Sequence, residues 1–215
     1  MENIKAAIFD LDGTVLDSMW VWTEIDKRFL GDRNLEVPAD YLEAIAPLGA
    51  RKAAEYTIER FGLNEKVEDI MGEWFDMAMG AYENEVQCKP FVIKYLNQLK
   101  TKGIKLAVAT SSDRKLIIPA LKRNRIIDMF DAIITVDQVE RGKGFPDIYE
   151  KAARDVGVSD NSQCIVYEDI LAGIKGARMG GFKTVGVYED HSSYEHPEMK
   201  KLSDRFIMSF KELLD

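Results

Sequence analysis

Short apolar runs separate amphipathic stretches over much of this chain. The first run, Ala-Ala-Ile-Phe at residues 6–9, ends in acidic and glycine residues, which is typical of a strand buried on both faces of a parallel sheet. After Pro90, further strands are predicted over 104–109, 132–135, 164–167, 183–187 and 206–207. They alternate with helices predicted over 91–102, 113–123, 146–156 and 170–179, and a short helix ends the chain. This alternation predicts an α/β fold with a doubly wound parallel sheet.

Residues 18–86 show a different pattern, because they contain no convincing strand. Helices are predicted there over 18–30, 38–46, 51–61 and 65–82, with proline and glycine marking some of their ends. The opening strand therefore has no partner nearby in the sequence and must pair with the later strands. We predict that residues 1–15 and 88–215 form one α/β core domain, into which residues 16–87 are inserted as an all-helical cap domain.

Composition and charge narrow the classes of partner. The 215 residues carry a net charge of −8 at pH 7, which disfavours binding to nucleic acid or an anionic membrane. No apolar run reaches the roughly 18 residues of a membrane span and no signal segment opens the chain, so we expect a soluble cytoplasmic protein. Cys88 and Cys164 are too few for a disulfide scaffold or a zinc cluster and are expected to be reduced. The acidic stretches 36–43 and 189–198 are expected to be solvated surface.

Polar side chains stand at or just after the C-terminal ends of four predicted strands. These ends share one edge of a parallel sheet, where open α/β folds bind ligands. On an extended segment, Asp10 and Asp12 point to the same side and need a counter-charge, for which a divalent cation with oxygen ligands is the simplest choice. The full candidate set is Asp10, Asp12, Thr110, Ser111, Lys143, Glu168 and Asp169.

Each member of this set also has an ordinary structural explanation. Asp10 and Asp12 fit a solvated turn, and Thr110-Ser111 begins a typical helix N-cap segment. Lys143 fits a surface position, and acids such as Glu168-Asp169 are favoured where a helix begins. Their occurrence in order at successive strand ends, however, favours an active site over these separate explanations.

Four segments of the chain resemble the haloacid dehalogenase superfamily, in its phosphatase and phosphomutase branch. They are F-D-L-D-G-T at 9–14, A-V-A-T-S-S at 107–112, R-G-K-G-F-P-D-I-Y at 141–149 and Y-E-D-I-L-A-G-I-K-G-A at 167–177. The chain looks most like the subgroup that contains phosphoglycolate phosphatase and β-phosphoglucomutase, with a Rossmann-like core and a helical cap. It departs at Gly144-Phe145, where relatives usually have proline directly after the lysine, and at Ile170, where many have a small or hydroxyl residue.

The resemblance implies a role for each member of the set. Asp10 would attack phosphorus to form an aspartyl-phosphate, and Asp12 would act as general acid and then as general base. Mg²⁺ would be bound by Asp10, the Asp12 carbonyl, Asp169 and Glu168. The phosphoryl oxygens would be bound by Thr110, the Ser111 backbone N–H and Lys143.

The helical cap carries one further candidate and one informative difference. In relatives, the loop that corresponds to 46–51 carries an arginine that faces the active site, so Arg51 is a candidate substrate contact; a solvated surface arginine is the alternative. β-Phosphoglucomutase relatives have a histidine in the first cap helix at the position of Trp22, and a phosphate-binding lysine in the later cap helices, where this chain offers only Lys66. The histidines of this chain, His191 and His196, belong to a late polar loop that we expect to be remote.

The resulting interpretation is a Mg²⁺-dependent phosphatase of a small phosphorylated metabolite, acting as a monomer or weak homodimer. A β-phosphoglucomutase-like phosphomutase is the first alternative, and a catalytically silent binding protein on the same scaffold is the second. A dehalogenase is disfavoured, because its relatives usually lack the second acid that stands here as Asp12. The sequence does not identify the substrate, because the cap residues resemble ordinary helical surface and core.

Overall fold

The structure is a computed structural model that describes residues 3–45, 48 and 50–215. Its internal contacts divide the chain into two compact units. The core unit combines the residues up to Ser18 with Gln87–Asp215, and the helical unit comprises Met19–Val86. The assignment of these parts as a catalytic core and a cap stays a prediction.

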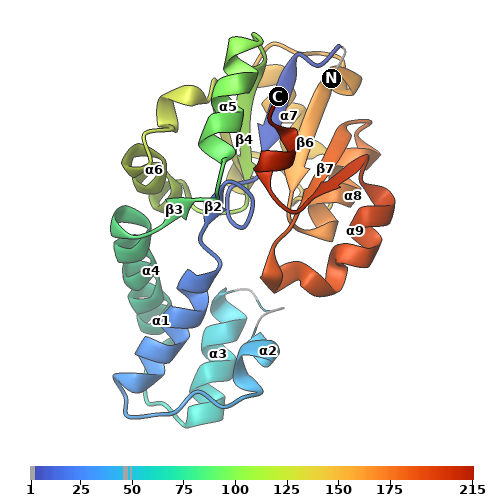
Figure 1. The fold of residues 1–215 in the computed structure, drawn as a ribbon. Helices are drawn as coiled ribbons and strands as arrows, with labels where there is room; N and C mark the ends of the chain where they lie inside the picture. Colours follow the sequence, from blue (N-terminus) through green and yellow to red (C-terminus); the bar gives the residue numbers. More distant parts are fainter. Residues whose placement is uncertain (1–2, 46–47, 49) are drawn as a thin grey trace. The chain divides into compact units, whose positions relative to one another are not determined.

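A six-stranded sheet forms the centre of the core unit (Figure 1). In spatial order its strands are β5 (Ala132–Thr135), β4 (Lys105–Thr110), β1 (Ala6–Phe9), β6 (Cys164–Glu168), β7 (Lys183–Val187) and β8 (Arg205–Ile207). Every neighbouring pair is parallel, which confirms the predicted α/β class and its parallel sheet. Phe9 in the central strand is level with Val108 of β4 and Tyr167 of β6, so the C-terminal ends of these strands lie side by side.

Both faces of the central strand are buried, as its continuous apolar sequence requires. On one face, Ile8 belongs to an apolar cluster with Tyr149 of α7 (Asp147–Asp155) and Ala177 of α8 (Leu171–Met179). These two helices therefore hold the loops that precede them, which carry site residues, against the same edge of the sheet.

The opposite face carries an aromatic cluster. The Phe9 ring stacks on Tyr167 with 4.4 Å between ring centroids. Tyr95 of α5 (Val92–Thr101) donates to or accepts from the Tyr167 hydroxyl at 2.5 Å, and Phe210 of the 3-10 helix η5 (Phe210–Leu213) packs against the same rings. Large planar side chains thus fill the space between the sheet and α5.

The other described elements of the core unit are β2 (Leu16–Asp17), β3 (Gln87–Cys88), α6 (Arg114–Arg123), η1 (Ile127–Met129), η2 (Val136–Gln138), η3 (Asn161–Gln163), η4 (Asp190–Glu195) and α9 (His196–Leu202). The short antiparallel pair β2–β3 was not predicted.

The expectation that 189–198 is wholly solvated surface is wrong, because Glu189 and His196 are buried. Glu189 forms an ion pair, and His196 packs between the rings of Tyr188 and Phe206.

The helical unit contains only helices among its described residues. They are α1 (Trp20–Gly31), α2 (Tyr41–Ile45), α3 (Ala50–Phe61) and α4 (Val67–Asn84). Phe29 meets Trp74 edge-on between α1 and α4, with ring centroids 5.4 Å apart, and Tyr41 meets Phe61 in the same way between α2 and α3. Across the part of the chain that is described, no helix has the length and apolar content needed to cross a membrane.

Candidate active site

Three buried carboxylates meet at the C-terminal edge of the sheet. Asp10 directly follows β1, Glu168 is the last residue of β6, and Asp169 follows it. One carboxylate oxygen from each lies within 4.8 Å of the others, and all three residues are buried. The sheet creates this meeting, because β1 and β6 are parallel neighbours whose ends are level.

Lys143 joins this acidic cluster from the loop between η2 and α7. Its Nζ donates to Asp10 Oδ1 and to Glu168 Oε1, the latter at 2.8 Å, and its side chain is only 5% exposed. The loop can approach this closely because residue 176 is glycine: a Cβ there would overlap the carbonyl oxygen of Lys143. The Tyr149 hydroxyl of α7 also donates to Glu168 Oε1, at 2.8 Å.

The turn after β1 holds Asp169 in a similarly close contact. Gly13 has a φ of +80°, and a Cβ on it would overlap the Asp169 carboxylate, so both its backbone conformation and its close approach require glycine. The next residue, Thr14, donates its hydroxyl to Asp169 Oδ1 at 3.1 Å. A glycine at 173 makes comparable room for the Glu168 side chain.

The electrostatics of this cluster are unbalanced, because one ammonium group faces three carboxylates. Burial raises the pKa of Glu168 to about 7, although Lys143 favours its charged form. Burial and the charges of Asp10 and Glu168 raise the pKa of Asp169 well above its usual range. Burial alone would lower the pKa of Lys143, but Asp10 and Glu168 outweigh that effect and raise it. The charged state of all three acids therefore calls for a second cation.

The residues fit a hard divalent cation. The donors are carboxylate oxygens, which Mg²⁺ and Ca²⁺ prefer. The second oxygen of Glu168, Oε2, is buried and has no hydrogen-bond partner among the described residues, which is costly for a carboxylate unless another group satisfies it.

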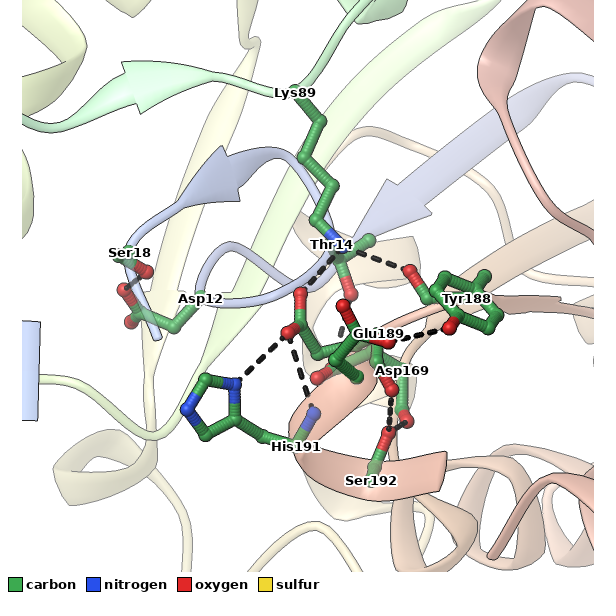
Figure 2. A network of polar contacts seen from close by, with 10 residues as sticks. Asp12, Thr14, Ser18, Lys89, Asp169, Tyr188, Glu189, His191 and Ser192 are labelled. Atoms are coloured by element: carbon green, nitrogen blue, oxygen red, sulfur yellow. Dashed lines mark hydrogen bonds and ion pairs between the residues drawn. The ribbon is translucent and has the colours of Figure 1, made fainter. Parts of the chain in front are cut away.

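Asp12 lies outside the acidic cluster and is half-buried. Its carboxylate accepts hydrogen bonds from Ser18 Oγ at 2.6 Å and from Ser112 Oγ at 2.5 Å; the contact with Ser18 is drawn in Figure 2. Ser112 in turn donates its backbone N–H to Thr110 Oγ1 at 3.1 Å, so Asp12 is linked to the end of β4. The two hydroxyl donors fix the orientation of the Asp12 carboxylate.

The other predicted site residues, Thr110, Ser111 and Arg51, differ in burial and in the unit to which they belong. Thr110 is buried at the end of β4, whereas the side chain of Ser111 is exposed. Arg51 is an exposed residue of α3 in the helical unit, where it forms an ion pair with Glu68 at 2.9 Å. Three of its neighbours in the predicted loop, at 46, 47 and 49, lie outside the described residues. The structure thus brings Asp10, Lys143, Glu168 and Asp169 together, and the role of Arg51 stays a prediction.

A second polar network borders the cluster and was not predicted (Figure 2). Ser192 Oγ donates to the Asp169 carbonyl at 2.6 Å. Lys89 Nζ forms an ion pair with Glu189 Oε2 at 2.6 Å, and Glu189 Oε1 lies 3.1 Å from Nδ1 of His191. His191 thus belongs to the segment that contacts Asp169, and its remoteness from position 22 of the helical unit stays a prediction. The segments that meet here are far apart in the sequence, and only Thr14, the last residue of the motif at 9–14, carried a usable signal.

Comparison with known proteins gives independent evidence for the family to which this chain belongs. The sequence model of the Haloacid dehalogenase-like hydrolase family matches residues 7–187. The chain is 34% identical to the Bacillus subtilis (strain 168) protein YhcW, provisionally named a phosphatase, over 85% of this chain and 82% of that protein. It is 32% identical to the beta-phosphoglucomutase of the same organism, over 86% of this chain and 83% of the relative.

A solved structure agrees with these sequence matches. The structure of a HAD hydrolase, family IA, variant 3, from Entamoeba histolytica superposes with a TM-score of 0.80 and 25% identity, covering 98% of this chain and 96% of that one. The family match covers most of the chain, including both segments that carry the acidic cluster. The chain is therefore an enzyme of the haloacid dehalogenase-like hydrolase family.

Proposed function

We propose that the chain is a Mg²⁺-dependent phosphatase that hydrolyses a small phosphorylated metabolite, such as a sugar phosphate, through an aspartyl-phosphate on Asp10. The observation that carries this proposal is the position of the Asp10 carboxylate. It is buried at the end of the central strand, bonded to Lys143 and adjacent to Glu168 and Asp169. A carboxylate held in this way is oriented for attack and shielded from bulk water.

In the first step, one oxygen of Asp10 attacks phosphorus, and the bond between phosphorus and the leaving alkoxide oxygen breaks. Asp12 delivers a proton to that oxygen, so that an alcohol leaves. In the second step, Asp12 accepts a proton from water, whose oxygen attacks the aspartyl-phosphate and releases inorganic phosphate. The hydroxyls of Ser18 and Ser112 support this role by holding the Asp12 carboxylate in one orientation.

Asp10, Glu168, Asp169 and the Asp12 carbonyl would bind the metal ion. When bound, Mg²⁺ would offset the excess of carboxylates and withdraw negative charge from the phosphoryl oxygens. Lys143, Thr110 and the Ser111 backbone N–H would bind the same oxygens from the protein. The buried position of Thr110 at the end of β4, the strand next to β1, supports this assignment.

A phosphomutase is the second candidate, because one relative at 32% identity is named beta-phosphoglucomutase. A mutase must protect its aspartyl-phosphate from water until a sugar phosphate accepts the group. Mutase relatives use a histidine at this position of the first cap helix. This chain has Trp22 there, and its indole cannot accept a proton. We therefore favour hydrolysis.

The test is a turnover assay on sugar phosphates, phosphoglycolate, nucleotides and pyrophosphate, with Mg²⁺ and with EDTA. We expect stoichiometric inorganic phosphate from at least one monoester with Mg²⁺ and none in EDTA. Conversion of β-glucose 1-phosphate to glucose 6-phosphate faster than phosphate release would favour the mutase. Absence of any turnover across the panel would favour a silent binding protein.

A further inference from the structure

A closed ring of contacts surrounds Asp169 in the core unit (Figure 2). On one side, Thr14 donates to the Asp169 carboxylate at 3.1 Å. On the other, Ser192 donates to the Asp169 carbonyl at 2.6 Å. The side chain and the backbone of Asp169 are thus fixed by two segments, the turn after β1 and the helix η4 after β7.

Lys89 joins these two segments. Its backbone N–H donates to the Val15 carbonyl at 2.9 Å, next to Thr14. Its Nζ donates to the Tyr188 carbonyl at 2.8 Å and forms the 2.6 Å ion pair with Glu189, three residues before Ser192. One residue therefore bridges the turn after β1 and the loop after β7.

Glu189 completes the ring. Its Cγ lies 3.3 Å from the position that a Cβ on Gly13 would occupy, so it packs on the turn that contacts Asp169. The side chains of Lys89 and Glu189 are 14% and 9% exposed. Burial would raise the pKa of Glu189, but Lys89 outweighs that effect and lowers it, so the pair stays charged. A buried, charged pair has a strong preference for one geometry, because separating its members leaves uncompensated charge.

We propose that Lys89, through its ion pair with Glu189, is a positioning residue that holds Asp169 in the geometry required to bind the metal ion. This inference rests on the proposed function, in which Asp169 is a metal ligand. Lys89 does not touch the acidic cluster in any contact described above and acts through Thr14 and Ser192. Partners of this kind that orient a ligand commonly change metal affinity about 10- to 100-fold.

The main test is the double variant Lys89→Met/Glu189→Gln, with Mg²⁺ affinity measured by isothermal calorimetry. The single Lys89→Met variant would leave the Glu189 charge, which itself attracts cations, so it would mix two effects. The double variant preserves net charge and overall shape, and it removes the ion pair together with the hydrogen bond from Lys89 Nζ to the Tyr188 carbonyl. We expect its Mg²⁺ dissociation constant to rise about tenfold or more, and turnover lost at low Mg²⁺ to recover at high Mg²⁺.

The matched control is Lys175→Met/Glu198→Gln. It removes an ion pair of similar length, 2.8 Å, in the same unit, whose side chains are about half exposed. We expect its Mg²⁺ affinity to stay within twofold of the wild type. Lys89→Arg, which retains the charge, should recover most of the affinity.

The outcomes separate this inference from the proposed function. Wild-type protein that binds Mg²⁺ while the Lys89→Met/Glu189→Gln variant binds it equally well would overturn the positioning role alone. Wild-type protein that binds no Mg²⁺ would overturn the proposed function and the positioning role with it. A thermal melting temperature close to that of the wild type, together with weakened Mg²⁺ binding in the double variant, would support positioning over a general loss of folding.

Discussion

In the core unit, the buried carboxylates of Glu168 and Asp169 both accept hydrogen bonds, whereas the buried carboxylate of Asp26 in the helical unit has none among the described residues. Tyr41 lies close enough for the charge of Asp26 to raise its pKa, but its hydroxyl forms a hydrogen bond with Thr57, at 2.7 Å. Burial therefore raises the pKa of Asp26 to about 7 without any opposing partner. The comparison separates carboxylates that are organised for charge from one that is merely buried.

This difference has a physical consequence for each unit. Acids with a lysine, hydroxyl donors and a fitting cation can remain ionised in a buried site. An acid with no partner is more stable in its neutral form, so its ionisation opposes folding. We expect the core unit to respond mainly to metal ions and the helical unit to respond mainly to pH.

The largest effect is expected from Asp10→Asn, which keeps the shape of the side chain and removes the nucleophile. Turnover with Mg²⁺ should fall by about 10³-fold or more, because no aspartyl-phosphate can form. The measurement is kcat for phosphate release, with circular dichroism to show that the fold persists. Near-normal turnover in this variant would refute the proposed mechanism.

The next effect is expected from Lys143→Met, which leaves the acidic cluster without its ammonium group. In EDTA the free energy of unfolding should fall by about 3–5 kcal/mol, as for other buried pairs that lose one partner. Urea unfolding measures this loss, and added Mg²⁺ should recover part of it. Lys105→Met is the control, because its ion pair with Asp131 is partly exposed and should contribute less than about 1 kcal/mol. Equal losses in the two variants would mean that the cluster does not depend on Lys143.

Much of this arrangement could be predicted from the sequence, for reasons that differ between its parts. Strands such as β1 are apolar without interruption, so their burial and their parallel pairing follow from pattern alone. The meeting of Asp10 with Glu168 and Asp169 follows from strand ends sharing an edge. The ion pair between Lys89 and Glu189 could not be predicted from the sequence, because its members are 100 residues apart and neither belongs to a periodic pattern. The two-residue strands β2 and β3 are likewise too short to produce a pattern.

The orientation of individual side chains was also beyond the sequence. That Asp12 points to the same side of the segment as Asp10 stays a prediction. The sequence did not indicate that the Asp12 carboxylate accepts hydrogen bonds from Ser18 and Ser112. In the sequence, Asp26 resembles an ordinary polar residue of a helix, and only the packing of the helical unit shows that it is buried.

A smaller effect, specific to the helical unit, is expected from Asp26→Asn. The pKa of Asp26 in the folded state, about 7, lies above the ordinary value of 3.8, so the folded state resists ionisation. The resulting loss of stability is absent at low pH, grows as pH rises from about 4 to 7, and is complete above pH 7. The stabilisation by Asn relative to Asp should therefore increase by about 2–3 kcal/mol between pH 5 and pH 8.

Denaturant unfolding at the two pH values measures this change. Asp32→Asn is the control, because Asp32 is exposed just after the same helix and should show little pH-dependent difference. A pH-independent effect of Asp26→Asn would show that folding does not raise the pKa of Asp26 and would overturn this prediction.

The smallest effect on stability is expected from Arg51→Ala, which breaks an exposed ion pair and so contrasts with the buried pair of Lys143. The side chains of Arg51 and Glu68 are 57% and 66% exposed, so the free energy of unfolding should change by less than about 0.5 kcal/mol.

The same variant tests a role in substrate binding. If Arg51 contacts an anionic or polar part of the substrate, its removal should raise KM for the preferred sugar phosphate about tenfold or more, and leave KM for a small generic phosphate ester unchanged. Arg60→Ala is the matched control, since Arg60 lies on the same helix α3 and forms a comparable exposed pair with Asp40 at 3.1 Å. Identical KM values for the Arg51→Ala and Arg60→Ala variants on both substrates would make Arg51 an ordinary surface residue, and a rise confined to Arg51→Ala and to the larger substrate would assign the helical unit a part in specificity.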